Sequence, residues 1–91
     1  MIIEIINKGG IYCYKKNNDI LYIGKTKNNF NIRDYEHKNN SNPTEFENLL
    51  KNDLNILYEI LYDCSVCPLT NEQLDYLETC FIKHLKPKYN I

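Results

Sequence analysis

The 91-residue chain lacks several features that would assign it to large classes of protein. It has no tryptophan or alanine, only three glycines and three prolines, and no repeated or low-complexity segment. It also has no run of about eighteen apolar residues, so we expect no membrane-spanning helix. Because no composition break or long linker divides the sequence, we expect one domain over residues 1–91.

A secretory signal is also missing. Residues 1–6, Met-Ile-Ile-Glu-Ile-Ile, are apolar but contain an acid and lack a small-residue cleavage site. This pattern predicts a strand rather than a signal peptide. Without secretory signals, the four cysteines are expected to remain free thiols in a reducing, intracellular compartment.

Positive charge is not in excess. The formal net charge of −1 argues against a protein held to nucleic acid by bulk positive charge. Residues 44–78 contain eight acids and one lysine, whereas the remainder contains ten bases and four acids. If the fold brings the two ends together, one face is positive; ordinary scattered surface charge is the alternative.

The most informative pattern that is present lies near the start of the chain. Gly10-Ile11-Tyr12 and Tyr22-Ile23-Gly24 belong to two alternating apolar runs. The polar stretch between them, Lys15–Asp19, contains asparagines, which tolerate positive φ angles. Together these features predict a β-hairpin.

The simplest register of this hairpin pairs Tyr12 with Tyr22 through a three-residue loop, Lys16–Asn18. Because side chains alternate between the faces of a strand, Tyr12, Tyr14 and Tyr22 would then share one face. The opposite face would be apolar. A slip of one residue would destroy this division.

The following segment predicts a short helix over Phe30–Lys38, capped by Asn28 or Asn29. Arg33 and His37 are four residues apart, so they share one face of this helix.

A second helix is predicted to begin near Asn42, with this residue as the cap, Pro43 at the first position and Glu45 completing a capping pattern. Its apolar stripe would consist of Phe46, Leu49, Leu50 and Leu54. A third strand is predicted over Ile56–Asp63.

The last helix has the clearest start signal. Thr70 caps it, Gln73 returns the capping bond, and Leu69 can pack on Leu74 as a hydrophobic staple. The apolar stripe of this helix is formed by Leu74, Leu77, Phe81, Ile82 and Leu85. Glu78 falls inside that stripe, where a carboxylate is costly unless a cation, a metal or several donors compensate it.

The spacing of Cys64, Cys67, Cys80 and His84 is similar to that of the ligands in a zinc finger. A helix that starts at Thr70 places Cys80 about 13 Å along its axis beyond the first turn. Only residues 68–70 separate Cys67 from that turn, so the chain would have to run back nearly fully extended for Cys67 to reach Cys80. We therefore interpret this spacing as coincidental.

In their order and spacing, these features resemble the GIY-YIG nuclease family over nearly the whole chain. The residues that carry the resemblance are Gly10-Ile11-Tyr12, Tyr22-Ile23-Gly24, Arg33, His37, Glu78 and Asn90. The resemblance implies an α/β (α+β) fold, in which three helices flank an antiparallel sheet of three main strands. The order would be β-β-α-α-β-α, with residues 2–6 as a candidate extra strand.

The family resemblance also implies metal-dependent hydrolysis of DNA phosphodiester bonds. Glu78 would bind one divalent cation, Mg²⁺ or Mn²⁺, and Arg33 would contact the scissile phosphate. Tyr12 would act as the general base. A phenol has a pKa of about 10, so Tyr12 would need positive charge nearby to lower that pKa by about three units.

The other motif residues receive supporting roles from the same resemblance. Tyr22 would orient water or phosphate, His37 would assist proton transfer, and Asn90 would hold the site together by hydrogen bonds. Contacts to DNA are assigned to Lys25, Lys27 and Lys38. Lys25 is further hypothesised to touch the phosphate or to lower the pKa of a tyrosine.

Many relatives carry a separate DNA-binding module. We therefore expect that a partner subunit or a homodimer supplies specificity, or that cleavage has little sequence preference. The alternative function is a nuclease-inactive DNA-binding or partner-binding module of the same fold.

Overall fold

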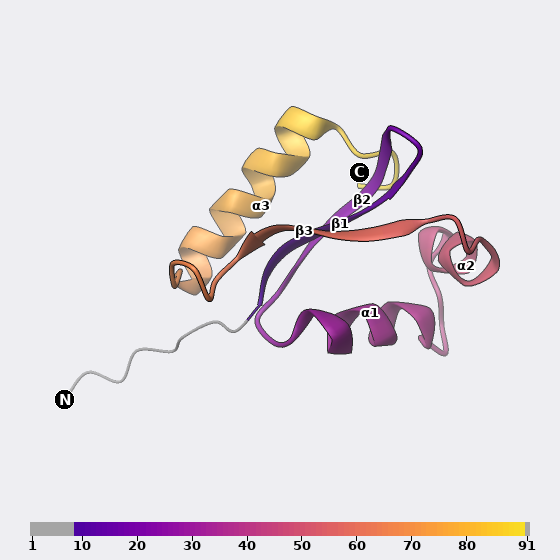
Figure 1. Cartoon of the computed structure of the whole chain (residues 1–91), viewed down its shortest axis with the longest axis horizontal. Helices are drawn as coiled ribbons and strands as arrows, with labels where there is room; N and C mark the ends of the chain where they lie inside the picture. The colour runs from indigo at the N-terminus through magenta and orange to yellow at the C-terminus, as the bar shows by residue number, and fades with distance from the viewer. Residues whose placement is uncertain (1–8, 91) are drawn as a thin grey trace.

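A computed structural model describes residues 9–90. Its elements are β1 (Gly10–Lys16), β2 (Asp19–Thr26), α1 (Phe30–Lys38), α2 (Glu45–Asn52), β3 (Leu57–Asp63) and α3 (Asn71–Leu85) (Figure 1). The predicted α+β fold with the order β-β-α-α-β-α is confirmed. The strand expected over residues 2–6 lies outside the described residues. Among residues 9–90, no helix has the length and apolar character needed to cross a bilayer.

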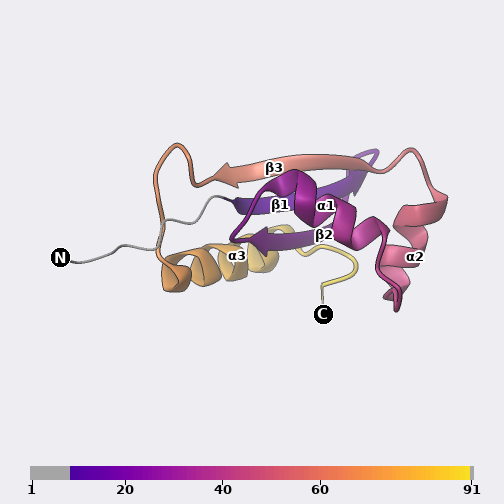
Figure 2. The ribbon, with the colours of Figure 1, turned by 90° about the horizontal axis from the view of Figure 1, so that it is seen from below.

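The three strands form one antiparallel sheet in the order β2-β1-β3, so β1 is central and β2 is an edge. The helix α3 covers one face of this sheet, and α1 and α2 lie on the other (Figures 1 and 2). The structure therefore has two layers of helix with the sheet between them.

Each face of the sheet carries its own core. Tyr12 and Tyr14 face α1 and α2, where they pack with Phe46 and other buried residues. Ile11 and Ile23 face α3 in a second cluster. The predicted division into a phenol face and an aliphatic face is therefore confirmed, but both faces are buried.

The predicted register of the hairpin is wrong by two residues. Tyr12 lies opposite Gly24, and Tyr14 lies opposite Tyr22. The loop is a two-residue turn that contains Asn17 at a φ of 58°, and Leu21 forms a bulge in β2 that absorbs the odd residue. Because the shift is even before the bulge, Tyr12, Tyr14 and Tyr22 keep their predicted face, whereas Leu21, expected on the aliphatic face, packs with the phenols.

Cap chemistry correctly predicted the starts of α1 and α3. The Asn29 side chain accepts a hydrogen bond from the Asn31 backbone, and Thr70 and Gln73 form a capping box. In α3, the residues that reach the core are Leu74, Leu77, Phe81 and Ile82. Leu85, which the apolar stripe also included, is 41 % exposed.

The start of α2 differs from the prediction. Thr44, not Asn42, is the cap, and its partner in the capping box is Glu47. This reciprocal pair satisfies two backbone N–H groups, and the helix therefore begins two residues after Pro43. It ends at Asn52, so Leu54 lies beyond it and is 96 % exposed.

The C-terminal segment covers the outer edge of β2. The Tyr89 N–H donates to the Leu21 carbonyl at 2.8 Å. The Asn90 side chain pairs with Ile23 in both directions, accepting from its N–H and donating to its carbonyl, each at 2.7 Å. These bonds hold β2 at the point where its Tyr-Ile-Gly motif lies.

Candidate active site

The two motif tripeptides meet across the sheet at Gly24. A Cβ atom on Gly24 would lie 2.3 Å from the Tyr12 hydroxyl oxygen, closer than side-chain atoms approach one another. The missing side chain of Gly24 therefore gives the Tyr12 phenol its place. Gly10 has a comparable role, because its Cβ would lie 1.9 Å from the Tyr62 carbonyl oxygen.

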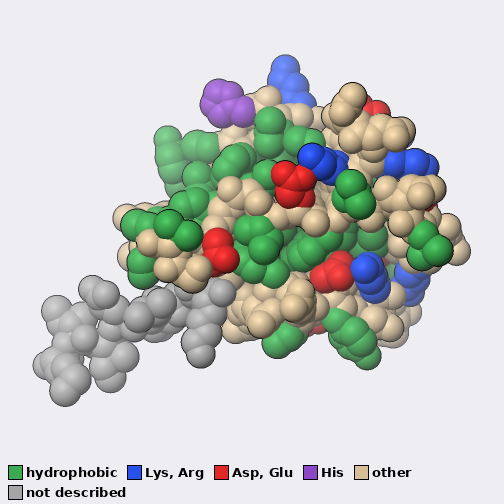
Figure 3. Space-filling view, viewed as in Figure 1, with side chains coloured by type: hydrophobic (Ala, Val, Ile, Leu, Met, Phe, Trp, Pro, Cys, Tyr) green, Lys and Arg blue, Asp and Glu red, His purple; other side chains and the backbone are tan. Residues whose placement is uncertain are grey.

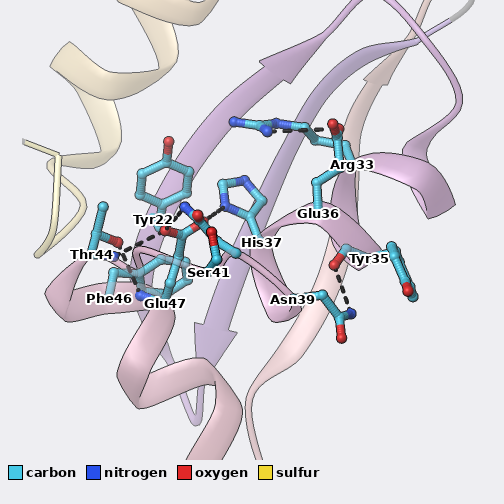
Figure 4. A pocket seen from close by; sticks show the side chains of 11 residues that line it. Tyr22, Arg33, Tyr35, Glu36, His37, Asn39, Ser41, Thr44, Phe46 and Glu47 are labelled. Carbon is cyan, nitrogen blue, oxygen red and sulfur yellow. Dashed lines mark hydrogen bonds and ion pairs between the residues drawn. The ribbon is translucent and has the colours of Figure 1, made fainter.

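The Tyr12 hydroxyl is held by a buried chain of polar groups. Its oxygen lies 2.6 Å from His37 Nε2, and His37 Nδ1 lies 2.8 Å from Glu47 Oε2. Figure 4 shows His37 and Glu47 joined at the back of a pocket, with Tyr22 and Arg33 beside them. The three linked residues come from β1, α1 and α2, so the chain connects the sheet to both helices on this face.

The charge states within this chain follow from its contacts. Burial would raise the pKa of Glu47, but hydrogen bonds from the Thr44 backbone, His37 and Asn40 lower it to about 2. Burial lowers the pKa of His37 below its ordinary value, and the positive charge of Arg33 acts in the same direction. Glu47 is therefore ionised and His37 neutral at neutral pH.

The two motif phenols differ in their access to solvent. Tyr12 is 0 % exposed, and burial raises its pKa above the usual value, although Arg33 opposes this. Arg33 alone therefore does not produce the lowering of the Tyr12 pKa that the sequence led us to expect. Tyr22 is half-buried; its pKa is raised mainly by burial, lowered by Arg33 and raised by Glu78.

Arg33 lies at the mouth of the pocket that these residues line. The pocket has a volume of about 620 Å³ and includes Tyr22, Arg33, His37 and Glu47 in its wall. Figure 4 shows the Arg33 guanidinium extending past His37 on the side of the Tyr22 hydroxyl. Arg33 also pairs with Glu36 at 3.7 Å.

Glu78 reaches the same edge from the opposite layer. Its side chain is 22 % exposed, and the Lys25 ammonium lies 3.9 Å from its Oε1. Lys25 also pairs with Asp75, one turn earlier on α3. Burial raises the pKa of Glu78 above its ordinary value, and Lys25 opposes this effect. The acid is thus partly enclosed, as its place in the apolar stripe predicts.

The other basic residues are more dispersed than a continuous positive face requires. Lys27 is exposed on the loop between β2 and α1, and Lys38 pairs with Asp34 at 3.0 Å. Lys15 pairs with Glu59 on the far strand of the sheet at 2.6 Å. Lysine and acidic side chains lie interspersed on the face that Figure 3 shows.

Two further residues on this face, Tyr14 and Glu47, were not among the predicted site residues. Tyr14 is fully buried and donates to Asp34 at 2.6 Å, which is a packing role. Glu47 is a residue that the sequence reasoning missed. The signal was available, because Thr44 lies three residues before Glu47, the spacing of a capping box.

The carboxylate of Glu78 fits a metal ion that keeps most of its water ligands. Within residues 9–90, no group of three His, Cys, Asp or Glu side chains is arranged to hold a metal. A lone, partly enclosed carboxylate such as Glu78 suits Mg²⁺, which binds through one or two carboxylates, substrate phosphate and water.

Comparison with known proteins gives consistent matches. A family model described as a UvrC-like GIY-YIG domain matches residues 8–91. UvrABC system protein C of Fusobacterium nucleatum is 38 % identical over 92 residues, which is 98 % of this chain and 14 % of that protein. Spermatocyte protein spe-27 of Caenorhabditis elegans is 37 % identical over 59 residues, covering 65 % of this chain and 45 % of that protein. The chain thus spans less than half the length of either relative.

Solved structures share the fold. The GIY-YIG N-terminal endonuclease domain of UvrC from Thermotoga maritima, bound to its catalytic magnesium, has a TM-score of 0.63 at 23 % identity. The match covers 94 % of this chain and 86 % of that one. A point mutant of the same domain, bound to the catalytic divalent cation, gives a TM-score of 0.64 at 22 % identity with the same coverage. From the match of the family model to residues 8–91, this chain belongs to the family of UvrC-like GIY-YIG domains.

Proposed function

We propose that this chain is a metal-dependent endonuclease domain that hydrolyses DNA phosphodiester bonds. The observation that supports this most is a convergence at one sheet edge. Tyr22 on β2, Arg33 on α1 and Glu78 on α3 come from three separate elements. Tyr22 and Arg33 line one pocket, Lys25 of the same strand lies 3.9 Å from Glu78, and the charges of Arg33 and Glu78 both affect the pKa of Tyr22. A guanidinium for a phosphate and a carboxylate for a cation thus flank one phenol.

Glu78 would hold the divalent cation, Mg²⁺ or Mn²⁺. When bound, the cation would offset the negative charge of Glu78 and stabilise the charge that develops on the phosphate and the leaving oxygen. Arg33 would bind the non-bridging oxygens of the same phosphate, a task that suits a planar and permanently charged donor.

Solvent access favours Tyr22 over Tyr12 as the base. Because Tyr12 is fully buried and Tyr22 is half-buried, Tyr22 is the phenol that water can reach. We assign the removal of the water proton to Tyr22, in place of the Tyr12 base that the sequence favoured. Tyr12 and His37 would then support the site from behind, and Asn90 would hold β2 in place through Ile23.

A few surface lysines support DNA as the substrate. Lys25, Lys27 and Lys38 would contact the DNA backbone, with Lys25 leaving Asp75 to reach a phosphate. Since the net charge is −1, these few contacts give weak binding. A partner subunit or a second copy of the chain would therefore supply specificity, and the free cysteines suit an intracellular setting.

Nicking of supercoiled plasmid tests this function. With Mg²⁺ or Mn²⁺, the native chain should convert supercoiled DNA to the open circle, and Glu78→Ala should lower the rate about 100-fold or more. Glu72→Ala is the matched control, because Glu72 is an exposed acid on the same helix. Its rate should equal that of the native chain.

Absence of nicking by the native chain with either cation would overturn the proposal. If the native chain and Glu78→Ala both bound DNA without cleavage, the binding-module alternative would replace it. Once cleavage is seen, a panel of duplex, flap, junction and single-stranded substrates would define the preferred DNA structure.

A further inference from the structure

We propose that Glu47 is a positioning residue of this active site: through His37, it fixes the direction in which the Tyr12 hydroxyl points its proton. The proposal rests on the proposed nuclease function, because Tyr12 lies beside the residues assigned to cleavage. It adds a buried acid from α2 to a site whose other members lie on β1, β2, α1 and α3.

The contacts of Glu47 leave one arrangement of protons. Its Oε1 accepts from the Thr44 backbone N–H at 3.0 Å and from Asn40 Nδ2 at 2.9 Å. Its Oε2 lies 2.8 Å from His37 Nδ1. An ionised carboxylate can only accept, so the proton of a neutral His37 must lie on Nδ1. The Glu47 side chain is only 7 % exposed, so water competes little for these bonds.

The proton on His37 Nδ1 determines what happens at the other ring nitrogen. Nε2 is then a bare acceptor, and the Tyr12 hydroxyl, 2.6 Å away, must donate to it. The lone pairs of the Tyr12 oxygen are left to face the Arg33 guanidinium, which is a pure donor. The positive charge of Arg33 lowers the pKa of Tyr12, as expected of a cation on the lone-pair side of the phenol oxygen.

The opposite tautomer would reverse every step. A proton on His37 Nε2 would donate to the Tyr12 oxygen, and the hydroxyl proton would turn toward Arg33. Two donors, the Tyr12 hydroxyl and the Arg33 guanidinium, would then face each other, although Arg33 is the residue assigned to the phosphate. The carboxylate of Glu47 prevents this, as second-shell partners fix the tautomer of a functional histidine elsewhere.

Glu47→Gln tests the proposal without removing the helix cap. A glutamine can still accept from the Thr44 N–H, as it does in other capping boxes. Its amide oxygen must stay on that side, because two donors, Thr44 N–H and Asn40 Nδ2, point there. Its NH₂ group then faces His37 Nδ1 and forces the ring proton to Nε2.

The measurement is the ¹⁵N spectrum of the histidine rings, with exposed His84 as an internal reference. His37 should carry its proton on Nδ1 in the native chain and on Nε2 in Glu47→Gln. Glu45→Gln is the matched control, since it removes one exposed acid from the same helix turn. It should leave the tautomer unchanged. Plasmid nicking should fall about 10- to 100-fold in Glu47→Gln alone.

The outcomes separate this proposal from the proposed function. If His37 keeps the same tautomer in the native chain and in Glu47→Gln, the role of Glu47 is wrong, whatever the nicking rate. If the tautomer changes while nicking stays at the native rate, Glu47 does not position the site. If the native chain nicks no DNA at all, the nuclease function fails and the positioning role in cleavage fails with it, while the spectrum still decides the tautomer.

Discussion

Gly24 determines where the Tyr12 hydroxyl lies. The strands pair these two residues directly, and the phenol occupies the space that a side chain on Gly24 would fill. The two motifs are thus one packing unit, in which the tyrosine of the first tripeptide needs the glycine of the second. His37 prevents the ring from moving away, because it holds the hydroxyl on the far side.

Gly24→Ala should therefore destabilise the domain. The added methyl group would lie 2.3 Å from the Tyr12 hydroxyl oxygen and 2.5 Å from the ring carbon that bears it. Overpacking of this kind lowers the free energy of unfolding by about 1–3 kcal/mol, as urea denaturation can measure. Adding Tyr12→Phe removes the nearest atom and should reduce this loss. An unchanged free energy of unfolding in Gly24→Ala would contradict the packing described here.

At the scale of the elements, the N-terminus of α2 joins stability to the site. Glu47 closes the capping box and also accepts a hydrogen bond from His37 Nδ1, so one carboxylate fixes both the helix start and the orientation of the imidazole ring. Its neighbour Glu45 lies in the same turn but is exposed. The two acids therefore separate the effect of a buried network from that of the helix dipole.

Acid unfolding should reveal this network. The pKa of Glu47 is lowered from 4.5 to about 2 in the folded chain, so on acidification the unfolded chain binds its proton first. The stability from Glu47 is present above about pH 4.5 and is lost as the pH falls toward 2. Urea denaturation between pH 7 and pH 3 should give a shallower loss for Glu47→Gln than for the native chain. Glu45→Gln should follow the native curve; equal slopes in all three proteins would contradict the network.

The elements differ in how well the sequence predicted them. Thr70 was recognised by its capping partner Gln73, and the cap of α1 was narrowed to Asn28 or Asn29, whereas Asn42 was chosen for α2 although Thr44 is the cap. The hairpin register failed because a bulge at Leu21 leaves no local signature in the residues. The face of the tyrosines was still predicted correctly, since an even shift preserves the alternation of side chains, but the bulge places Leu21 on the opposite face from the one expected.

The site shows the same limit at longer range. Motif order identified the residues at the sheet edge, and the periodicity of α3 placed Glu78 in an apolar stripe. Pairing between distant segments could not be predicted, and the buried link from Tyr12 through His37 to Glu47 consists only of such pairs. A hydrogen bond between residues 25 positions apart depends on how α1 packs on β1.

At the scale of the whole molecule, both layers of the fold meet at the edge strand β2. Tyr22 belongs to the face packed on α1 and α2, and Ile23, the next residue, belongs to the face packed on α3. One strand therefore places Tyr22 beside Arg33 in the pocket on one side and Lys25 beside Glu78 on the other. The C-terminal segment closes the same edge through Asn90, so the strand cannot shift without breaking both of its bonds to Ile23.

This architecture predicts that DNA binding depends on a few phosphate contacts beside β2. In the Glu78→Ala background, the logarithm of the affinity for a short duplex should fall with the logarithm of salt concentration, with a slope of about −0.9 per phosphate contacted. Lys27→Ala should reduce the magnitude of that slope by about 1.

Lys15→Ala is the control, because Lys15 pairs with Glu59 on β3, the opposite edge of the sheet. Fluorescence anisotropy at several salt concentrations would measure all three proteins. Equal slopes for Lys27→Ala and its background, or a reduced slope for Lys15→Ala, would place the DNA on a different face of the sheet.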